Sequence, residues 1–307
     1  MLTNSAYRRQ ASAYGVLMLI TAIWGSTFLI TRQALTHTTP FTFLSIRFSI
    51  ASLILALGFS SRVRRMNRTD LLCAIGTGVI LFLTIALQTV GAPMVSASEA
   101  GFLMGLSIPL VPLVAVPVLR TVPARKALLG IVIAFCGLAV LSTGGRFKMV
   151  FHMGEALMIA AAVTTALHIV VVGKYAQRSD PTDLAVVQIF TTAGLSVLAM
   201  LISGEPRHLP GPSVWAAASG MAIFATAFAL IAMARVQSRL CPARASLIYA
   251  LEPVWAGGFG VLAGETLTRS AWGGCGLILT GILIGVNKPA AGTISGHTDI
   301  SARDISI

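Results

Sequence analysis

Acidic residues are scarce in this chain of 307 residues, which has 10 Asp and Glu against 22 Lys and Arg. Charged residues of both signs make up 10% of the chain, whereas a soluble domain carries about 25%. The net charge of +12 therefore reflects missing acids rather than a basic patch, so we expect no nucleic-acid partner. Hydrophobic residues make up 56%, and this composition predicts a membrane protein whose natural counter-charge is anionic lipid.

Motifs for catalysis, metal binding and nucleotide binding are also missing. The four cysteines are scattered without metal-ligand spacing or a disulfide framework, and are interpreted as small packing residues. The apolar segments contain no paired aspartates, no HExxH motif and no nucleophile elbow, and no GxxxxGKS/T loop is present to bind ATP. We therefore expect neither an enzyme nor a cofactor, and any transport must use a gradient, exchange or facilitation.

Apolar runs long enough to cross a bilayer dominate the sequence. A transmembrane helix needs about 20 mostly apolar residues. Ten such segments are predicted, at residues 12–31, 41–59, 70–90, 97–118, 126–142, 153–173, 182–203, 213–234, 243–263 and 271–286. The sequence thus predicts an all-α polytopic membrane protein with ten transmembrane helices, followed by a polar tail, residues 289–307, that we expect to be disordered and cytoplasmic.

The distribution of Lys and Arg predicts the orientation of these helices. With the amino terminus in the cytoplasm, sixteen Lys and Arg fall in inner segments and five in outer ones, while Arg47 lies within the second helix. Cytoplasmic loops carry an excess of Lys and Arg, so the sequence favours both termini in the cytoplasm. Arg8 and Arg9 resemble the start of a signal peptide, but the following apolar run is too long and no small-residue cleavage site follows it.

A shift of 144 residues aligns two halves of the chain, residues 12–142 and 153–286. The matched pairs include Leu103 with Leu247, Pro109 with Pro253, Arg125 with Arg269, Ala127 with Ala271, Gly130 with Gly274 and Gly137 with Gly281. The match pairs each helix with the fifth helix after it, so equivalent helices should cross the membrane in opposite directions. Inverted repeats of this kind are typical of transporters, with an old duplication that has no mechanical role as the alternative.

Glu252 and Pro253 lie deep within the ninth apolar segment. An ionisable side chain in hydrocarbon is costly and usually functional, and a proline cannot bond to the carbonyl four residues earlier, here that of Tyr249. Glu252 is thus a candidate for proton coupling or for binding a substrate amine, with a structural carboxyl bonded to a backbone amide or to Arg47 as the alternative. Pro253 and Pro109 are candidate hinges or helix breaks.

Five further residues are candidates for lining a cavity. Tyr249 shares a helix face with Glu252, three residues on, and we favour a cavity-lining role for its hydroxyl. Trp24 lies too deep for the interfacial aromatic belt, so it either stacks on a substrate or packs in the core. Arg47 could hold a substrate carboxylate, pair with an acid or snorkel outward, and Gln88 has a similar status. A buried His168 is more often a structural donor than a proton relay.

Short motifs in these segments resemble one family. They are Trp24-Gly25-Ser26-Thr27-Phe28, Arg47-Phe48, Ala250-Leu251-Glu252-Pro253-Val254 and Gly264-Glu265-Thr266-Leu267. With the five-plus-five repeat, their order resembles the drug/metabolite transporter superfamily, in its ten-helix EamA-type branch, over about residues 10–288. Ala166 in place of Trp24 and Gln188 in place of Arg47 in the second half predict a site without two-fold symmetry.

The resemblance implies two inverted five-helix repeats around a central cavity, with both termini in the cytoplasm. It implies a secondary transporter of a bacterial inner membrane that exports small metabolites by alternating access. The YddG-like exporters of aromatic amino acids are the suggested relatives, so the expected substrate is a neutral or aromatic amino acid. A channel-like or structural membrane protein is the alternative, ahead of an intramembrane enzyme. Substrate, driving force, direction and the choice between monomer and dimer stay open.

The topology leads to a labelling prediction. In a cysteine-free background, Ser301→Cys is expected to be protected from an impermeant thiol reagent in intact cells and to react once the membrane is permeabilised. His208→Cys, in a predicted outer loop, should react in intact cells and is the control. Labelling of Ser301→Cys from outside would contradict the predicted orientation.

Overall fold

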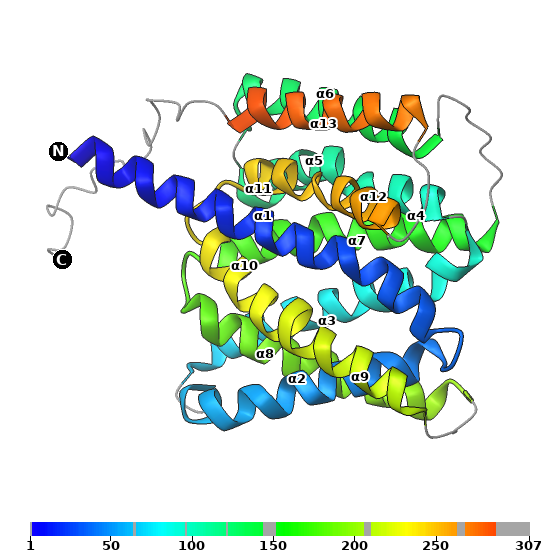
Figure 1. Cartoon of the computed structure of the whole chain (residues 1–307). Coiled ribbons are helices and arrows are strands. Elements are labelled where there is room, and N and C mark those ends of the chain that lie inside the picture. The colour runs from blue at the N-terminus through cyan, green and yellow to red at the C-terminus, as the bar shows by residue number, and fades with distance from the viewer. Residues whose placement is uncertain are drawn as a thin grey trace, which may run out of the picture.

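The computed structural model describes residues 2–63, 66–95, 97–120, 122–143, 152–205, 210–262 and 268–286. Every regular element in these ranges is a helix, which confirms the all-helical prediction (Figure 1). The elements are α1 (Leu2–Ala34), α2 (Pro40–Val63), α3 (Arg68–Gly91), the 3₁₀ turn η1 (Ala92–Met94), α4 (Ala97–Gly105), α5 (Ser107–Leu119), α6 (Arg125–Thr143), α7 (Met153–Tyr175), α8 (Pro181–Ile202), α9 (Pro212–Gly220), the π-helix η2 (Met221–Phe228), α10 (Ala229–Gln237), α11 (Pro242–Tyr249), α12 (Glu252–Leu262) and α13 (Arg269–Val286). The expected disordered tail, 289–307, and the motif at 264–267 lie outside the described residues.

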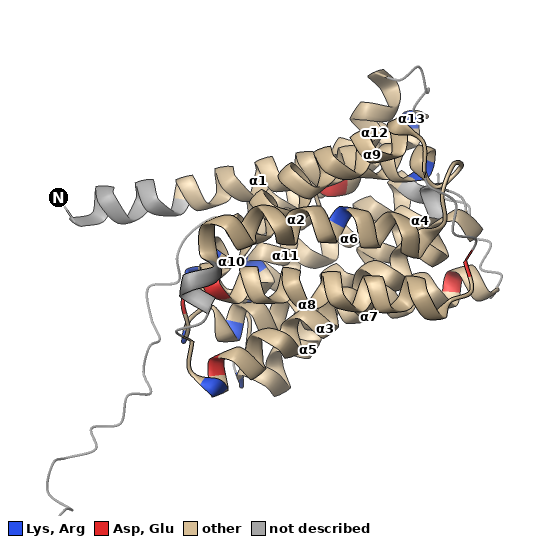
Figure 2. Cartoon of the chain, turned by 90° about the horizontal axis from the view of Figure 1, so that it is seen from below, with Lys and Arg blue, Asp and Glu red and all other residues tan. Residues whose placement is uncertain are grey.

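Nine segments of the described chain are long and apolar enough to cross a bilayer. Three of them combine shorter elements: Ala100–Leu119 covers most of α4 and all of α5, Pro212–Gln237 covers α9, η2 and α10, and Pro242–Leu262 covers α11 and α12. The remaining expected segment, residues 126–142, corresponds to α6, so the count of ten spans stays a prediction. Figure 2 shows Lys, Arg, Asp and Glu mainly near the ends of the helices, as a protein crossing a membrane requires.

Acidic side chains cap the starts of α2 and α8, each of which begins at a proline. Asp180 accepts a hydrogen bond from the amide of Thr182 at 2.8 Å. Glu205, from the segment after α8, accepts from the amides of Phe41 and Thr42 at 3.2 and 3.1 Å. The first amides of a helix have no partner within it and carry partial positive charge, so these carboxylates stabilise both helix starts.

Helices α6 and α13 pack backbone to backbone through glycines. A Cβ on Gly281 would lie 2.5 Å from the carbonyl oxygen of Gly130, and a Cβ on Gly274 would lie 2.6 Å from that of Gly137. Contacts of Gly130 with Gly281 and of Gly137 with Gly274 require the two helices to run antiparallel. The 144-residue shift matches Gly130 with Gly274 and Gly137 with Gly281. Gly130 therefore contacts the residue matched to Gly137, and Gly137 contacts the residue matched to Gly130. Small residues allow such close approach between membrane helices.

Other helix contacts also fall into matching pairs. Helices α2 and α8 pack together and run antiparallel, since Ser52 bonds to the Ile189 carbonyl and Ser45 to the Met200 sulfur. Helix α7 packs against α4 and α5, and α1 packs against α11 and α12. Helix α3 packs against α7 and α8, and the span made of α9, η2 and α10 packs against α1 and α2. In each of these pairs, helices of residues 2–143 pack against helices of residues 152–286.

The segments that contain Pro109 and Pro253 are each divided into two short helices. The chain turns at Leu106 between α4 and α5, and at Ala250–Leu251 between α11 and α12. At Leu106 and Leu251 the amide bonds to the carbonyl three residues earlier, at 3.2 and 3.0 Å, as a helical turn tightens before a proline. The result is a pair of discontinuous helices, the type of element that builds substrate sites in membrane transporters.

The glycine contacts lead to a stability prediction. Gly281→Ala is expected to lower the free energy of unfolding by about 1–3 kcal/mol, because its new methyl group meets backbone atoms that cannot move aside. Gly276→Ala, in the same helix with nothing within 4 Å of a Cβ, is the matched control and should be neutral or slightly stabilising. Thermal unfolding in detergent measures both variants. Equal melting temperatures would contradict a tight α6–α13 interface.

Candidate functional site

Trp24 joins α1 to two other parts of the bundle. Its Nε1 donates to the carbonyl oxygen of Ala225 in η2 at 3.0 Å, and its ring centroid lies 5.7 Å from that of Tyr249 at an angle of 42°. The next residue, Gly25, explains why α1 comes so close, because a Cβ there would lie 2.9 Å from the Glu252 carbonyl oxygen. The Trp24-Gly25 motif therefore brings an aromatic pair to the break between α11 and α12.

The acceptor of the Trp24 bond belongs to a π-helix. The amide of Ala229, the residue that follows η2, bonds to the carbonyl of Phe224, five residues earlier rather than four. Such widened turns occur often at functional sites, because they redirect carbonyls and side chains. No motif in the sequence predicted this element, since a run of small and apolar residues such as Met221–Phe228 also fits an ordinary helix.

Arg47 is buried, with 8% of its surface exposed, and its side chain contacts η2. Its Nε donates to the Thr226 hydroxyl at 2.8 Å, and its guanidinium lies 5.4 Å from the ring centroid of Phe48. The terminal nitrogens of the guanidinium have no partner among the described residues. Arg47 therefore does not snorkel outward, and its positive charge is held within the bundle without an acidic partner.

Glu252 is the first residue of α12 and is half-buried. The amino-terminal end of a helix favours a negative charge, and the carboxylate is within electrostatic reach of Tyr249. It makes no hydrogen bond or ion pair with any described side chain, and no ion pair joins it to Arg47. The structure therefore does not contain the structural ion pair between Arg47 and Glu252 that was the alternative.

Tyr249, the last residue of α11, is buried and bonded to a residue that sequence reasoning missed. Its hydroxyl accepts a hydrogen bond at 3.1 Å from Nε2 of Gln237, the last residue of α10. Gln237 is fully buried and its Oε1 has no partner. Gln237 lies just beyond the predicted segment 213–234, so a polar residue there was indistinguishable from a loop residue. Trp24, Arg47, Gln237, Tyr249 and Glu252 are called the α1–α12 cluster below.

His168 and Gln88 do not belong to this cluster. His168 in α7 is buried, and its Nε2 bonds to Oε1 of Gln188 in α8 at 2.9 Å. Gln188, at the position equivalent to Arg47, is fully buried and its Nε2 has no partner. This arrangement fits the structural interpretation of His168. Gln88 is half-buried in α3, where its carbonyl bonds to the amide of Ala92, and its side chain has no partner among the described residues.

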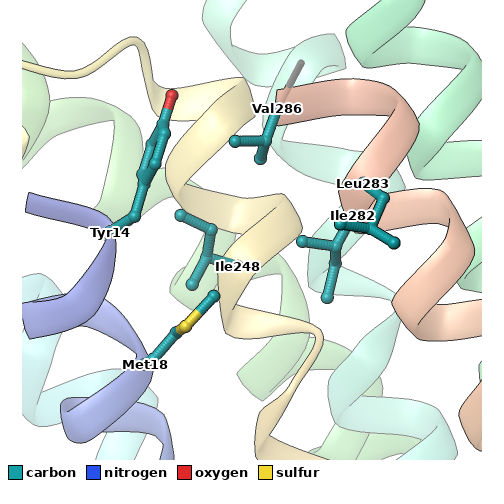
Figure 3. Close-up of a pocket in the computed structure, with 6 residues that line it drawn as sticks. All are labelled: Tyr14, Met18, Ile248, Ile282, Leu283 and Val286. Atoms are coloured by element: carbon teal, nitrogen blue, oxygen red, sulfur yellow. The ribbon is translucent and has the colours of Figure 1, made fainter. Parts of the chain in front are cut away.

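A small apolar pocket lies apart from the cluster, between α1, α11 and α13 (Figure 3). Its volume is about 80 Å³, and its lining residues are Tyr14, Met18, Ile248, Ile282, Leu283 and Val286. Apart from the Met18 sulfur and the Tyr14 hydroxyl, its lining side chains are hydrocarbon, so it has few polar groups that would orient a metabolite. Among the described residues, no group of His, Cys, Asp and Glu could hold a metal ion.

Comparisons with known proteins agree with this architecture. The chain matches the EamA-like transporter family twice, over residues 11–143 and 152–286. It is 30% identical to an uncharacterized transporter of Archaeoglobus fulgidus, over 92% of this chain and 91% of the relative, and 25% identical to the uncharacterized inner membrane transporter YedA of Escherichia coli, over 91% and 92%. A solved crystal structure superimposes with a TM-score of 0.75 at 21% identity, covering 89% of this chain and 96% of that one, which shows the fold alone. This multi-pass membrane protein belongs to the EamA-like transporter family.

Proposed function

We propose that this transporter exports small zwitterionic metabolites, neutral or aromatic amino acids above all, by alternating access around the α1–α12 cluster. The observation that carries the proposal is an arginine and a glutamate that have no partner of opposite charge among the described residues. Arg47 and Glu252 lie at the two ends of a chain of contacts that runs through Thr226, Ala225, Trp24 and Tyr249. A zwitterion with an apolar side chain has complementary groups for all of these residues.

The charges argue for a ligand because an isolated ion within a membrane is costly. Breaking or omitting one partner of a buried ion pair leaves an uncompensated charge, which is strongly destabilising. A substrate carboxylate could accept hydrogen bonds from the terminal nitrogens of Arg47, which the Thr226 bond leaves open. A substrate ammonium could pair with Glu252. Binding would then neutralise both charges at once.

The aromatic pair supplies the apolar part of the site. Trp24 and Tyr249 are tilted by 42° with centroids 5.7 Å apart, and each ring is held by a hydrogen bond at its polar end. Rings fixed in this way offer a large contact area at little entropic cost. Their location between Arg47 and Glu252 supports a substrate whose side chain is apolar or aromatic.

The packing of the two halves supports alternating access. Contacts of Gly130 with Gly281 and of Gly137 with Gly274 make α6 and α13 an antiparallel pair, and we propose that this pair joins two inverted repeats at residues 12–142 and 153–286. Two similar halves have two similar packings, one open to each side of the membrane. We further propose location in the bacterial inner membrane with both termini cytoplasmic, as the charge distribution favours.

The charge pairing leads to a selectivity prediction. In proteoliposomes, the parent should transport phenylalanine in preference to phenethylamine, which lacks the carboxylate, and to 3-phenylpropionate, which lacks the amine. Arg47→Gln is expected to lose the discrimination against phenethylamine, and Glu252→Gln the discrimination against 3-phenylpropionate. Each loss should be about tenfold or more, because a hydrogen bond to a charged group contributes about 1.5–3 kcal/mol.

The control variants carry the same two substitutions, Arg to Gln and Glu to Gln, at residues outside the cluster. Arg32→Gln removes an exposed arginine at the end of α1, and Glu155→Gln changes a carboxylate that accepts a bond from the His152 amide at the start of α7. Both should keep the parental preference. If Glu252→Gln instead keeps its preference but loses the dependence of transport on pH, Glu252 couples protons rather than binding an amine. Transport of lipophilic cations or sugar phosphates alone would refute the amino-acid proposal.

The helix break leads to a prediction about turnover. Pro253→Ala gives residue 253 an amide that can bond to the Tyr249 carbonyl, a gain of about 1 kcal/mol for the continuous helix. Because the side chains of the cluster are unchanged, we expect a lower maximal rate with little change in the half-saturating concentration. Pro117→Ala, at a proline inside α5 that does not end the helix, should match the parent. Counterflow measurements separate the two quantities, and a parental rate for Pro253→Ala would contradict a hinge role.

A further inference from the structure

We infer that Gln237 is a positioning residue that makes Tyr249 a hydrogen-bond donor to the substrate. The inference rests on the proposed function, because it assumes that the substrate binds against Tyr249. Gln237 itself cannot touch a substrate in this state, since none of its surface is exposed. Its influence must therefore pass through the single bond that it makes, from its Nε2 to the Tyr249 hydroxyl.

The local fold explains how the two residues meet. Gln237 ends α10, a short connection follows, and α11 begins at Pro242 and ends at Tyr249. Side chains on an α-helix lean toward its amino-terminal end, so Tyr249 leans back toward the start of α11 and the adjacent end of α10. The ring then lies against Trp24 on one side, and the hydroxyl meets the Gln237 amide at 3.1 Å.

The direction of this hydrogen bond decides whether the Tyr249 hydroxyl can donate to a substrate. An amide nitrogen only donates, so the phenol oxygen of Tyr249 is the acceptor and keeps its own hydrogen for another partner. The Oε1 of Gln237 does not take this hydrogen, because it has no hydrogen-bond partner among the described residues. No described side chain accepts it either, which leaves the Tyr249 hydroxyl available to an oxygen of the substrate.

A fully buried glutamine with an unpaired oxygen is an unusual arrangement. An unsatisfied buried polar atom destabilises a fold, and an apolar residue of similar size would avoid the penalty. A glutamine at this position is therefore explained if the hydrogen bond from its Nε2 to the Tyr249 hydroxyl serves substrate binding. Recognition of this kind discriminates strongly against a ligand that lacks the matching group, because the site is then left with an unpaired polar atom.

A double-mutant cycle tests the coupling with phenylalanine counterflow in proteoliposomes. Gln237→Leu and Tyr249→Phe are each expected to raise the half-saturating concentration about fivefold, the loss of one hydrogen bond. The maximal rate should change less. The double variant should be no weaker than Tyr249→Phe alone, because Gln237 acts only through the hydroxyl. Additive losses, or a change confined to the maximal rate, would overturn the inference.

An infrared measurement tests the bond polarity without any substrate. With ring-labelled tyrosine, the C–O stretch of Tyr249 is isolated as the difference between the parent and Tyr249→Phe, since the chain has only 4 tyrosines. The parental band should be that of a hydroxyl that accepts a hydrogen bond, and Gln237→Leu should shift it. A band typical of a hydroxyl that donates to the amide would overturn the inference.

Gln188→Leu is the matched control, because Gln188 is also fully buried with an unpaired amide nitrogen but bonds to His168 instead. It should leave the Tyr249 band and the half-saturating concentration at parental values. If the parent does not carry phenylalanine, the proposed function fails, while the infrared band still decides whether Gln237 sets the polarity of Tyr249. A parental band in Gln237→Leu would refute the inference even if phenylalanine is transported.

Discussion

The low dielectric of the membrane interior is the constraint on which the rest of this structure depends. An ion placed there is costly, and neither Arg47 nor Glu252 has a partner of opposite charge among the described side chains. The surrounding residues instead hold the two charges apart: Thr226 holds the arginine, and the start of α12 places the carboxylate where the helix dipole favours it. The structure thus places a guanidinium and a carboxyl group in the bundle with no partner of opposite charge among the described side chains.

The bilayer also requires every backbone amide and carbonyl to form its hydrogen bonds within the protein. The discontinuous helices are compatible with this requirement only because other helices cover them. The breaks before Pro109 and Pro253 release carbonyls that lipid cannot bond. Helices α5 and α11 pack against each other, and Gly25 brings α1 against the carbonyl of Glu252. The break between α11 and α12 is therefore covered by α1, while the α6–α13 pair is regular and closely packed by glycines.

Much of the fold could be predicted from composition and spacing, because the membrane permits few solutions. Apolar length predicted nearly every helix boundary to within a few residues, apart from the ends of α1, and the expected break at Pro253 is present between α11 and α12. Glu252 was singled out by its depth in an apolar run and Tyr249 by a shared helix face, but the helix is interrupted between them, since α11 ends at Tyr249 and α12 begins at Glu252. Gln237, Thr226 and the π-helix were not predicted, because a hydrogen bond across 179 residues, as between Arg47 and Thr226, leaves no periodic pattern in either segment.

The sequence by itself determined that this chain crosses a membrane many times and that an acid followed by a proline lies deep within an apolar segment. Each of these follows from solvation or from local covalent geometry, which neighbours along the chain decide. Only the tertiary structure decided which polar groups meet. It paired His168 with Gln188 and Tyr249 with Gln237, and it left Arg47 and Glu252 apart. The physical reason is that side-chain hydrogen bonds form over about 3 Å, a distance that helix packing sets and sequence spacing does not.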